Sequence, residues 1–225
     1  MTEKEIQHRA VQYLEQHYKR QAKGGRLFAD VEMRTRQKFG GKRADGLLVF
    51  NHWLWGKVVV SLEAKSMKTL RAVKPHWDGW LMFRNCIRAG LFTALLSGAW
   101  MAFYRMDDGF WQFLLPINIF VLGALAYGFI TFRTYRHQRV NVIKQLQQYP
   151  GNEGWIAFDQ ASVDRMSEEQ WRHLRKICRF QGVGLLIVKS NKKVSEVESP
   201  RFTFKWFGDF LQFYSKEKEI RKLIG

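Results

Sequence analysis

Three polar residues on two neighbouring apolar segments have the types and the spacing that a metal-dependent hydrolase uses. Glu63 and Lys65 stand two apart in the segment VVVSLEAKS, and Asp45 stands in the earlier segment KRADGLLVF. Side chains two apart on a strand point to the same face of a sheet. If the two segments pair, all three side chains converge on one point. Two carboxylates beside an ammonium group predict a site for Mg²⁺ or Mn²⁺, because these ions prefer oxygen ligands and leave positions for water and phosphate.

The same residues also have an interpretation without catalysis. An acid and a base two apart on an exposed strand can form a surface ion pair, which contributes only about 0–1 kcal/mol to stability. Asp45 argues against this, because Leu47, Leu48 and Val49 follow it and predict a buried strand. Burying a carboxylate in apolar surroundings is costly unless the carboxylate has a purpose there. Asp45 therefore favours a functional site.

The segments around these residues alternate between helical and extended patterns. Apolar residues recur at helical spacing in some segments and in alternation or short runs in others. Helices are predicted over residues 2–20, 136–149, 167–180 and 207–224, and strands over residues 27–36, 44–50, 57–65, 155–158 and 184–189. This order predicts an α/β fold with a mixed sheet flanked by helices.

Two long uncharged runs interrupt the pattern after the third strand. Residues 89–104 and 110–132 carry no charged side chain. At about 1.5 Å per residue the second run reaches roughly 34 Å, enough for a hydrocarbon core of about 30 Å. We expect a two-helix transmembrane hairpin over residues 85–135, inserted between the two parts of a soluble domain, residues 1–84 and 136–225. The alternative is a helical hairpin that is buried in a soluble protein or lies in the membrane interface.

Charged and small residues predict the orientation and the contact face of this hairpin. Arginines flank both of its ends, whereas the turn between the runs holds Asp107 and Asp108. The positive-inside rule then places both termini and the soluble domain in the cytoplasm. Small residues let helices approach closely in lipid. They recur at every fourth position, at Ala94, Gly98 and Ala102 in the first run and at Ala124 and Gly128 in the second.

The charge of the chain indicates a polyanionic partner. The formal net charge is +17 and the isoelectric point is about 10.1. Nucleic acid and the anionic face of a membrane both attract such a protein, and the basic flanks of a membrane protein would explain the charge by themselves. The two cysteines, Cys86 and Cys178, lack zinc-ligand spacing, so a zinc site is not expected.

The order of the motifs resembles that of the PD-(D/E)XK nuclease superfamily. The strings KRADGLLVF, VVVSLEAKS and QLQQY are similar to those of the nuclease domain at the N-terminus of type I restriction subunits. The resemblance extends from Gly40 to Tyr149 with the hairpin removed. It implies a restriction-endonuclease-like mixed sheet and, with the hairpin, a location in a bacterial inner membrane.

The resemblance also implies a role for each site residue. Asp45, Glu63 and the carbonyl of Ala64 would hold Mg²⁺ or Mn²⁺. Lys65 would position the attacking hydroxide or neutralise developing charge. The family carries Q-x-x-x-Y on the following helix, and Gln145 and Tyr149 match it here. These two residues would contact DNA or brace the site, although helix surface and core packing would explain them as well.

One departure from the family concerns the first helix. Relatives often carry a glutamate there that faces the metal ion, whereas the best-phased position here holds Gln7. Glu3 and Glu5 lie nearer the end of the helix. Without a third carboxylate, metal binding would be weaker or the site would be inactive. Ala44 stands where some relatives have proline, which matters little.

These observations predict a membrane-anchored, metal-dependent endonuclease that hydrolyses DNA phosphodiester bonds, in restriction or defence against foreign DNA. DNA and the lipid bilayer are the expected partners, with a homo-oligomer left open and no small-molecule cofactor besides the metal ion. One alternative is a catalytically inactive nuclease-fold module that tethers nucleic acid or a partner protein at the membrane. Another is an effector whose hairpins oligomerise and perturb the bilayer.

Overall fold

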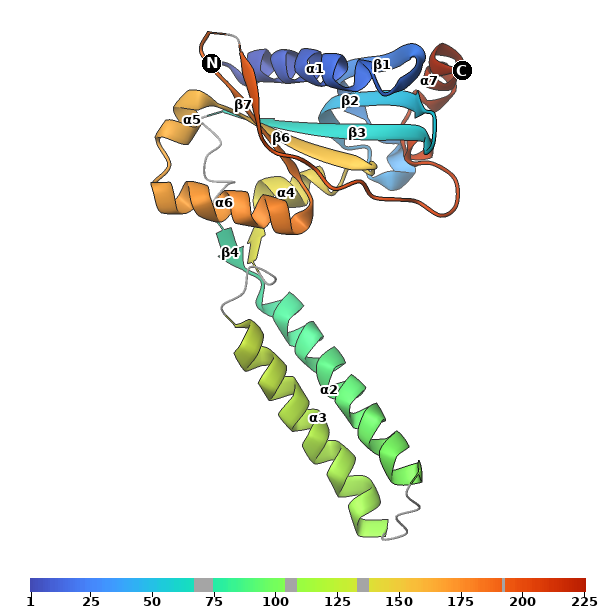
Figure 1. Ribbon diagram of the computed structural model, residues 1–225, viewed down its shortest axis with the longest axis vertical. Coiled ribbons are helices and arrows are strands. Elements are labelled where there is room, and N and C mark those ends of the chain that lie inside the picture. The colour runs from blue at the N-terminus through green and yellow to red at the C-terminus, as the bar shows by residue number, and fades with distance from the viewer. Residues whose placement is uncertain (67–74, 104–108, 133–137, 192) are drawn as a thin grey trace. The chain divides into compact units, whose positions relative to one another are not determined.

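The computed structural model describes residues 1–66, 75–103, 109–132, 138–191 and 193–225. Contacts divide the chain into two compact units, one of Met1–Pro75 with Val140–Gly225 and the other of His76–Arg139. Figure 1 shows the first unit as a sheet with helices and the second as two long helices. The hairpin predicted over residues 85–135 falls within the second unit.

The elements of the first unit begin and end as follows. They are α1 (Glu3–Lys19), β1 (Ala22–Arg34), the 3₁₀ turn η1 (Gln37–Phe39), β2 (Arg43–His52), β3 (Gly56–Lys65), α4 (Asn141–Leu146), β6 (Glu153–Asp159), α5 (Gln160–Asp164), α6 (Glu168–Gln181), β7 (Gly184–Val188), β8 (Val194–Glu198), the 3₁₀ turn η4 (Phe210–Phe213) and α7 (Glu217–Ile224). The remaining helices are α2 (Gly79–Phe103) and α3 (Gly109–Thr131), and the strands β4 (Pro75–Trp77) and β5 (Gln138–Val140) pair as a small sheet.

The main sheet is mixed and has six strands in the order β1-β2-β3-β6-β7-β8. The first three strands form an antiparallel meander, β3, β6 and β7 run parallel, and β8 returns antiparallel. The predicted α/β class with a mixed sheet is confirmed. Strand β8 was not predicted, because its sequence VSEVE lies in a polar region that was interpreted as a loop.

Alternate residues of the central strands build two cores on opposite faces of the sheet. On one face Leu48, Val60 and Leu62 pack in a cluster that includes Ile6 and Leu14 of α1. On the other face the core lies under η4 and α7 and includes Leu47, Val49, Val59, Tyr214 and Ile220. In Figure 1, α1 covers one face of the sheet, and α4 and α6 lie on the other. Both faces of β2 and β3 are therefore buried.

The start of α1 is set by a capping box. The Thr2 hydroxyl accepts a hydrogen bond from the amide of Glu5, and the Glu5 carboxylate accepts one from the amide of Thr2. This reciprocal pair satisfies two amides that a helix start would otherwise leave unpaired. It also places Glu3 in the first turn of the helix.

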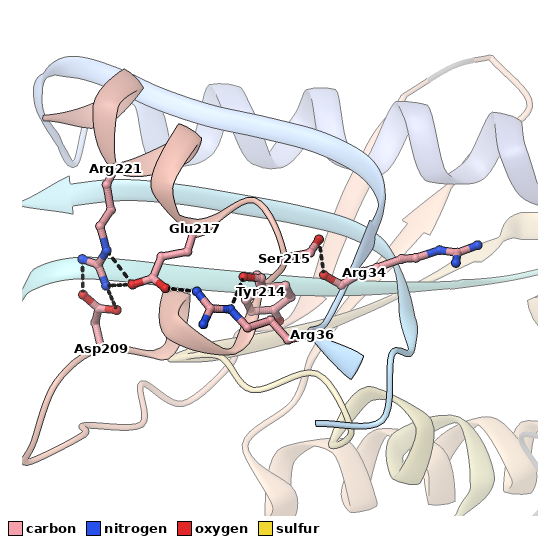
Figure 2. Close-up of polar contacts among 7 residues, drawn as sticks. All are labelled: Arg34, Arg36, Asp209, Tyr214, Ser215, Glu217 and Arg221. Atoms are coloured by element: carbon pink, nitrogen blue, oxygen red, sulfur yellow. Dashed lines mark hydrogen bonds and ion pairs between the residues drawn. The ribbon is translucent and has the colours of Figure 1, made fainter. Parts of the chain in front are cut away.

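A polar network holds the C-terminal segment against the end of β1 (Figure 2). The Arg36 guanidinium donates to the carbonyl of Tyr214 at 3.2 Å and pairs with the Glu217 carboxylate. Arg221 lies 2.7 Å from Glu217 and donates to both oxygens of Asp209 at 2.8 and 2.9 Å. These bonds join α7 both to the turn before it and to the end of β1.

Two predicted helices are shorter than expected. The helix predicted over residues 207–224 is wrong in its first half, because Gly208 has a φ of +69° and the chain forms η4 before α7 begins. The helix predicted over residues 136–149 begins only at Asn141, since Gln138–Val140 form β5, and it ends at Leu146. Residues 136 and 137 lie outside the described part.

The first strand starts earlier than the predicted residues 27–36. Gly24 and Gly25 lie inside β1, each with a φ of +68°. The pairing with β2 shifts register between Ala22 and Leu27. Left-handed backbone of this kind favours glycine, and it forms the irregularity in the strand.

Helices α2 and α3 are both long and apolar enough to cross a membrane, and most of their surface is exposed. They touch at Gly90, where an added Cβ would lie 2.7 Å from the Phe120 carbonyl, and at Gly123, where one would lie 2.2 Å from Thr93 Oγ1. Gly98 was expected at this contact but has nothing within 4 Å of that position. The close approach therefore lies nearer the start of α2 than predicted.

Gly184 provides a test of the core packing between β6 and β7. A Cβ at this position would lie 2.4 Å from a ring atom of the fully buried Trp155. We expect Gly184→Ala to destabilise the protein by about 1–3 kcal/mol, the usual range for an overpacked core. Thermal unfolding in detergent, followed by circular dichroism, measures this. Ser190→Ala, in the exposed turn after β7, is the control, and equal unfolding temperatures for the two variants would contradict the packing.

Candidate metal and phosphate site

The pairing of β2 with β3 brings Asp45 and Glu63 together. Gly46 pairs with Leu62 in the antiparallel register, so the next residues outward, Asp45 and Glu63, are opposite each other. Residues directly opposite in an antiparallel pair share a face. The amide of Ala64 donates to Asp45 Oδ2 at 2.8 Å, which ties the aspartate to the strand that carries the glutamate. The two carboxylates therefore lie on the same side of the sheet.

Lys65 completes this cluster from the same strand. Its Nζ lies 2.6 Å from Glu63 Oε1, and the side chains of Asp45, Glu63 and Lys65 are all buried. Among the described residues, the second oxygen of Glu63, Oε2, is buried without a hydrogen-bond partner. A buried carboxylate oxygen normally has a partner, so this oxygen could accept a bond from a ligand.

Burial and mutual repulsion raise the proton affinity of both carboxylates. Desolvation raises the pKa of Glu63 to about 7, the Asp45 charge adds to this rise, and Lys65 opposes it. The pKa of Asp45 is also raised, first by burial, while the Ala64 amide and Lys65 lower it. Two acids held in this way are under electrostatic strain that a cation between them would relieve.

The first helix contributes a third acid, but not through the position that its phase suggested. Glu3 Oε1 lies 4.0 Å from Lys65 Nζ, and the Glu3 charge raises the pKa of both Asp45 and Glu63. Gln7 is buried on α1, and it makes no hydrogen bond to the three site residues in the described part of the chain. The sequence feature that could have indicated Glu3 is the capping motif, because it sets where the helix begins.

The two residues of the Q-x-x-x-Y motif are placed differently. Tyr149 is buried near the carboxylates: desolvation raises its pKa to about 12, and the charges of Glu63 and Asp45 add to the rise. Gln145 is exposed on α4, which ends at Leu146. The turn after α4 instead places Gln148 within 2.6 Å of Lys42 Nζ. The structure therefore brings Tyr149 to the cluster and leaves Gln145 on the surface.

The cluster is suited to a hard divalent cation with few protein ligands. Among the described residues, no three His, Cys, Asp or Glu side chains come close enough to form a complete metal cage. Asp45 and Glu63 are the two acids here that could hold an ion, and such an ion would keep water or phosphate oxygens in its other positions. The proposed role of the Ala64 carbonyl remains a prediction.

In comparisons with known proteins, no family model, no curated protein and no solved structure matches this chain.

The raised pKa of Glu63 predicts how stability depends on pH in the absence of divalent ions. The folded protein binds a proton on Glu63 more tightly than the unfolded chain does. The stabilising effect of this proton is therefore complete below pH 4.5, and it is lost as the pH rises through about 7. The free energy of unfolding of the wild type, relative to Glu63→Gln, should fall by up to about 3 kcal/mol over this range. Denaturant titrations in EDTA measure it, and a constant or rising difference would refute it.

Proposed function

We propose that this protein is a membrane-anchored, metal-dependent endonuclease of the PD-(D/E)XK type that hydrolyses DNA phosphodiester bonds. The observation that carries the proposal is the buried cluster of Asp45, Glu63 and Lys65 at the end of two paired strands, with one carboxylate oxygen unpartnered. An acid on the second strand and E-x-K on the third are the arrangement that the motif resemblance implies. A mixed sheet flanked by helices is compatible with it.

Each residue of the cluster has a task in such a reaction. Asp45 and Glu63, with the Ala64 carbonyl, would hold Mg²⁺ or Mn²⁺, and the chemistry supplied by such an ion is activation of water and neutralisation of phosphate charge. The Ala64 amide fixes the position of the Asp45 carboxylate at 2.8 Å. Lys65, anchored on Glu63, would orient the attacking water or stabilise negative charge on the phosphate.

The proposed substrate and location follow from charge and from the two apolar helices. A net charge of +17 favours binding to the phosphates of DNA, and Tyr149 would brace the site or contact DNA. Helices α2 and α3 would cross a bacterial inner membrane with both termini and the nuclease domain in the cytoplasm. Foreign DNA that enters at the membrane is then the natural target, in restriction or defence.

Plasmid cutting by the purified protein in detergent tests the proposal. We expect cutting only with Mg²⁺ or Mn²⁺, and a loss of about 10²–10³-fold for Asp45→Asn, Glu63→Gln and Lys65→Met, because each removes a group that stabilises charge in the transition state. Asp30→Asn on β1 and Lys218→Met on α7 are matched controls that should cut normally. Full cutting by the three site variants would refute the assignment.

Metal affinity tests the role of Glu3 separately from activity. Its carboxylate is partly exposed and 4.0 Å from Lys65, so it should act through charge instead of direct ligation. We expect Glu3→Gln to weaken Mn²⁺ binding roughly 5-fold, as the loss of one nearby charge in high dielectric does. Asp45→Asn should weaken binding much more, and Gln7→Ala should not change it. Electron paramagnetic resonance of free Mn²⁺ measures all three, and a Gln7→Ala effect as large as that of Asp45→Asn would contradict these roles.

One observation favours the second candidate, an inactive nuclease-fold module that tethers nucleic acid or a partner protein. The ammonium group of Lys65 already occupies one oxygen of Glu63, and no complete cage of metal ligands exists among the described residues. An inactive module predicts salt-dependent DNA binding without metal-dependent turnover. Saturable Mn²⁺ binding that Asp45→Asn abolishes would argue against it.

A further inference from the structure

The end of the sheet opposite Lys65 carries an exposed aromatic patch. It consists of Trp53, Leu54 and Trp55 in the turn between β2 and β3, and of Phe204, Trp206 and Phe207 after β8. The ring of Trp55 lies 5.5 Å from that of Phe202 and 6.0 Å from that of Phe204, and Phe204 lies 5.5 Å from Trp206. Two segments far apart in the sequence thus form one apolar surface, which we call the aromatic patch.

The exposure of these side chains is unusual for a surface turn. Trp53 is 75% exposed, Trp206 is 84% exposed and Phe207 is 88% exposed. Single exposed apolar residues are common on proteins, but a contiguous group of this size marks an interaction site. Its composition of tryptophan, phenylalanine and one leucine is typical of surfaces that enter the headgroup region of a bilayer.

Basic residues lie at the same end of the domain as the aromatic patch. Ala22 of β1 pairs with His52, and Asn51 Nδ2 donates to the carbonyl of Ile224, so the starts of β1 and β3 and the end of α7 share this end of the domain. Figure 1 shows them on the same side. The nearby cations are Lys19, Arg20, Lys23, Arg26, Lys57 and Lys222.

Positive charge predominates around the patch. Residues 16–29, 46–62 and 199–208 include no aspartate or glutamate, and the adjacent Asp209 is paired with Arg221. Within the described residues, none of Lys19, Lys23, Arg26 or Lys57 forms an ion pair. Exposed tryptophans with cations around them complement a lipid bilayer, which has an apolar interior and an anionic headgroup surface.

We propose that the aromatic patch docks the soluble domain onto the anionic surface of the membrane in which its own hairpin is anchored. This inference rests on the proposed membrane anchoring. A domain tethered to a bilayer meets that surface at a high effective concentration, so modest docking energy suffices. Trp53, Leu54 and Trp55 would enter the headgroup region, and the cations would contact anionic lipids.

DNA is the competing partner for a basic aromatic surface, and geometry disfavours it. Strand β3 has ten residues, and the patch begins at its first residue whereas Lys65 is its last. At about 3.3 Å per residue the two ends are roughly 30 Å apart. DNA held at the patch would therefore be remote from the phosphate site.

The experiment measures how deeply a fluorescent probe on the protein lies in the bilayer of a lipid nanodisc. In a Cys86→Ser, Cys178→Ala background, the fluorophore NBD is attached to Leu54→Cys, to Leu95→Cys on α2 or to Glu168→Cys on α6. Nitroxide-labelled lipids quench probes that lie in the bilayer. We expect quenching at position 54 in nanodiscs with anionic lipid and none at position 168. Replacing Lys23, Arg26 and Lys57 by glutamine should shift docking roughly 100-fold toward the undocked state.

The three probe positions separate failure of docking from failure of anchoring. Quenching at position 95 without quenching at position 54 would overturn the docking proposal and leave the membrane anchoring intact. No quenching at position 95 would overturn the anchoring, and with it the docking. A probe at position 54 that responds to added duplex DNA but not to lipid would assign the patch to DNA instead. Self-quenching that depends on the number of copies per nanodisc would assign it to a second copy of the chain.

Discussion

The antiparallel register between β2 and β3 is the constraint on which the candidate site depends. Because Gly46 pairs with Leu62, the next pair outward consists of two carboxylates, and a slip of one residue would move one of them to the other face. Both faces of these strands are covered by apolar cores, so such a slip would also move Leu47 and Leu48 into the opposite cores and disrupt the packing of each. The packing of the whole domain thus enforces the meeting of Asp45 and Glu63.

The same packing makes the cluster electrostatically expensive. Two acids and one lysine are buried together, and the Ala64 amide and Lys65 compensate the two carboxylates in part. Stability alone would favour apolar residues at these positions, since buried ion pairs seldom stabilise more than a well-packed apolar substitute. The unpartnered oxygen of Glu63 adds to this cost. This cost agrees with the chemistry proposed for the cluster.

Much of the fold and part of the site could be predicted from the sequence. The apolar runs of β2 and β3, which predict strands, and the E-x-K spacing were sufficient to place Glu63 and Lys65 on one face. Helical phase suggested Gln7 and missed Glu3, because phase identifies a face of a helix but not where the helix ends relative to a strand. The motif spacing suggested Gln145 with Tyr149, but α4 ends before Tyr149, so the helical period no longer relates the two. Tertiary pairing of β4 with β5 also removed residues from the predicted helix.

The insertion of α2 and α3 between β3 and β6 has a consequence for biosynthesis. These parallel neighbours in the sheet are separated in the chain by both apolar helices, so the ribosome completes β1, β2 and β3 before the helices and makes β6 only after them. Until then the edge of β3 that pairs with β6 in the finished sheet has no strand beside it, and this stretch of β3 includes Glu63 and Lys65. An open edge of this kind can pair with other chains and aggregate. The carboxylate pair would become enclosed only when the second half of the domain arrives.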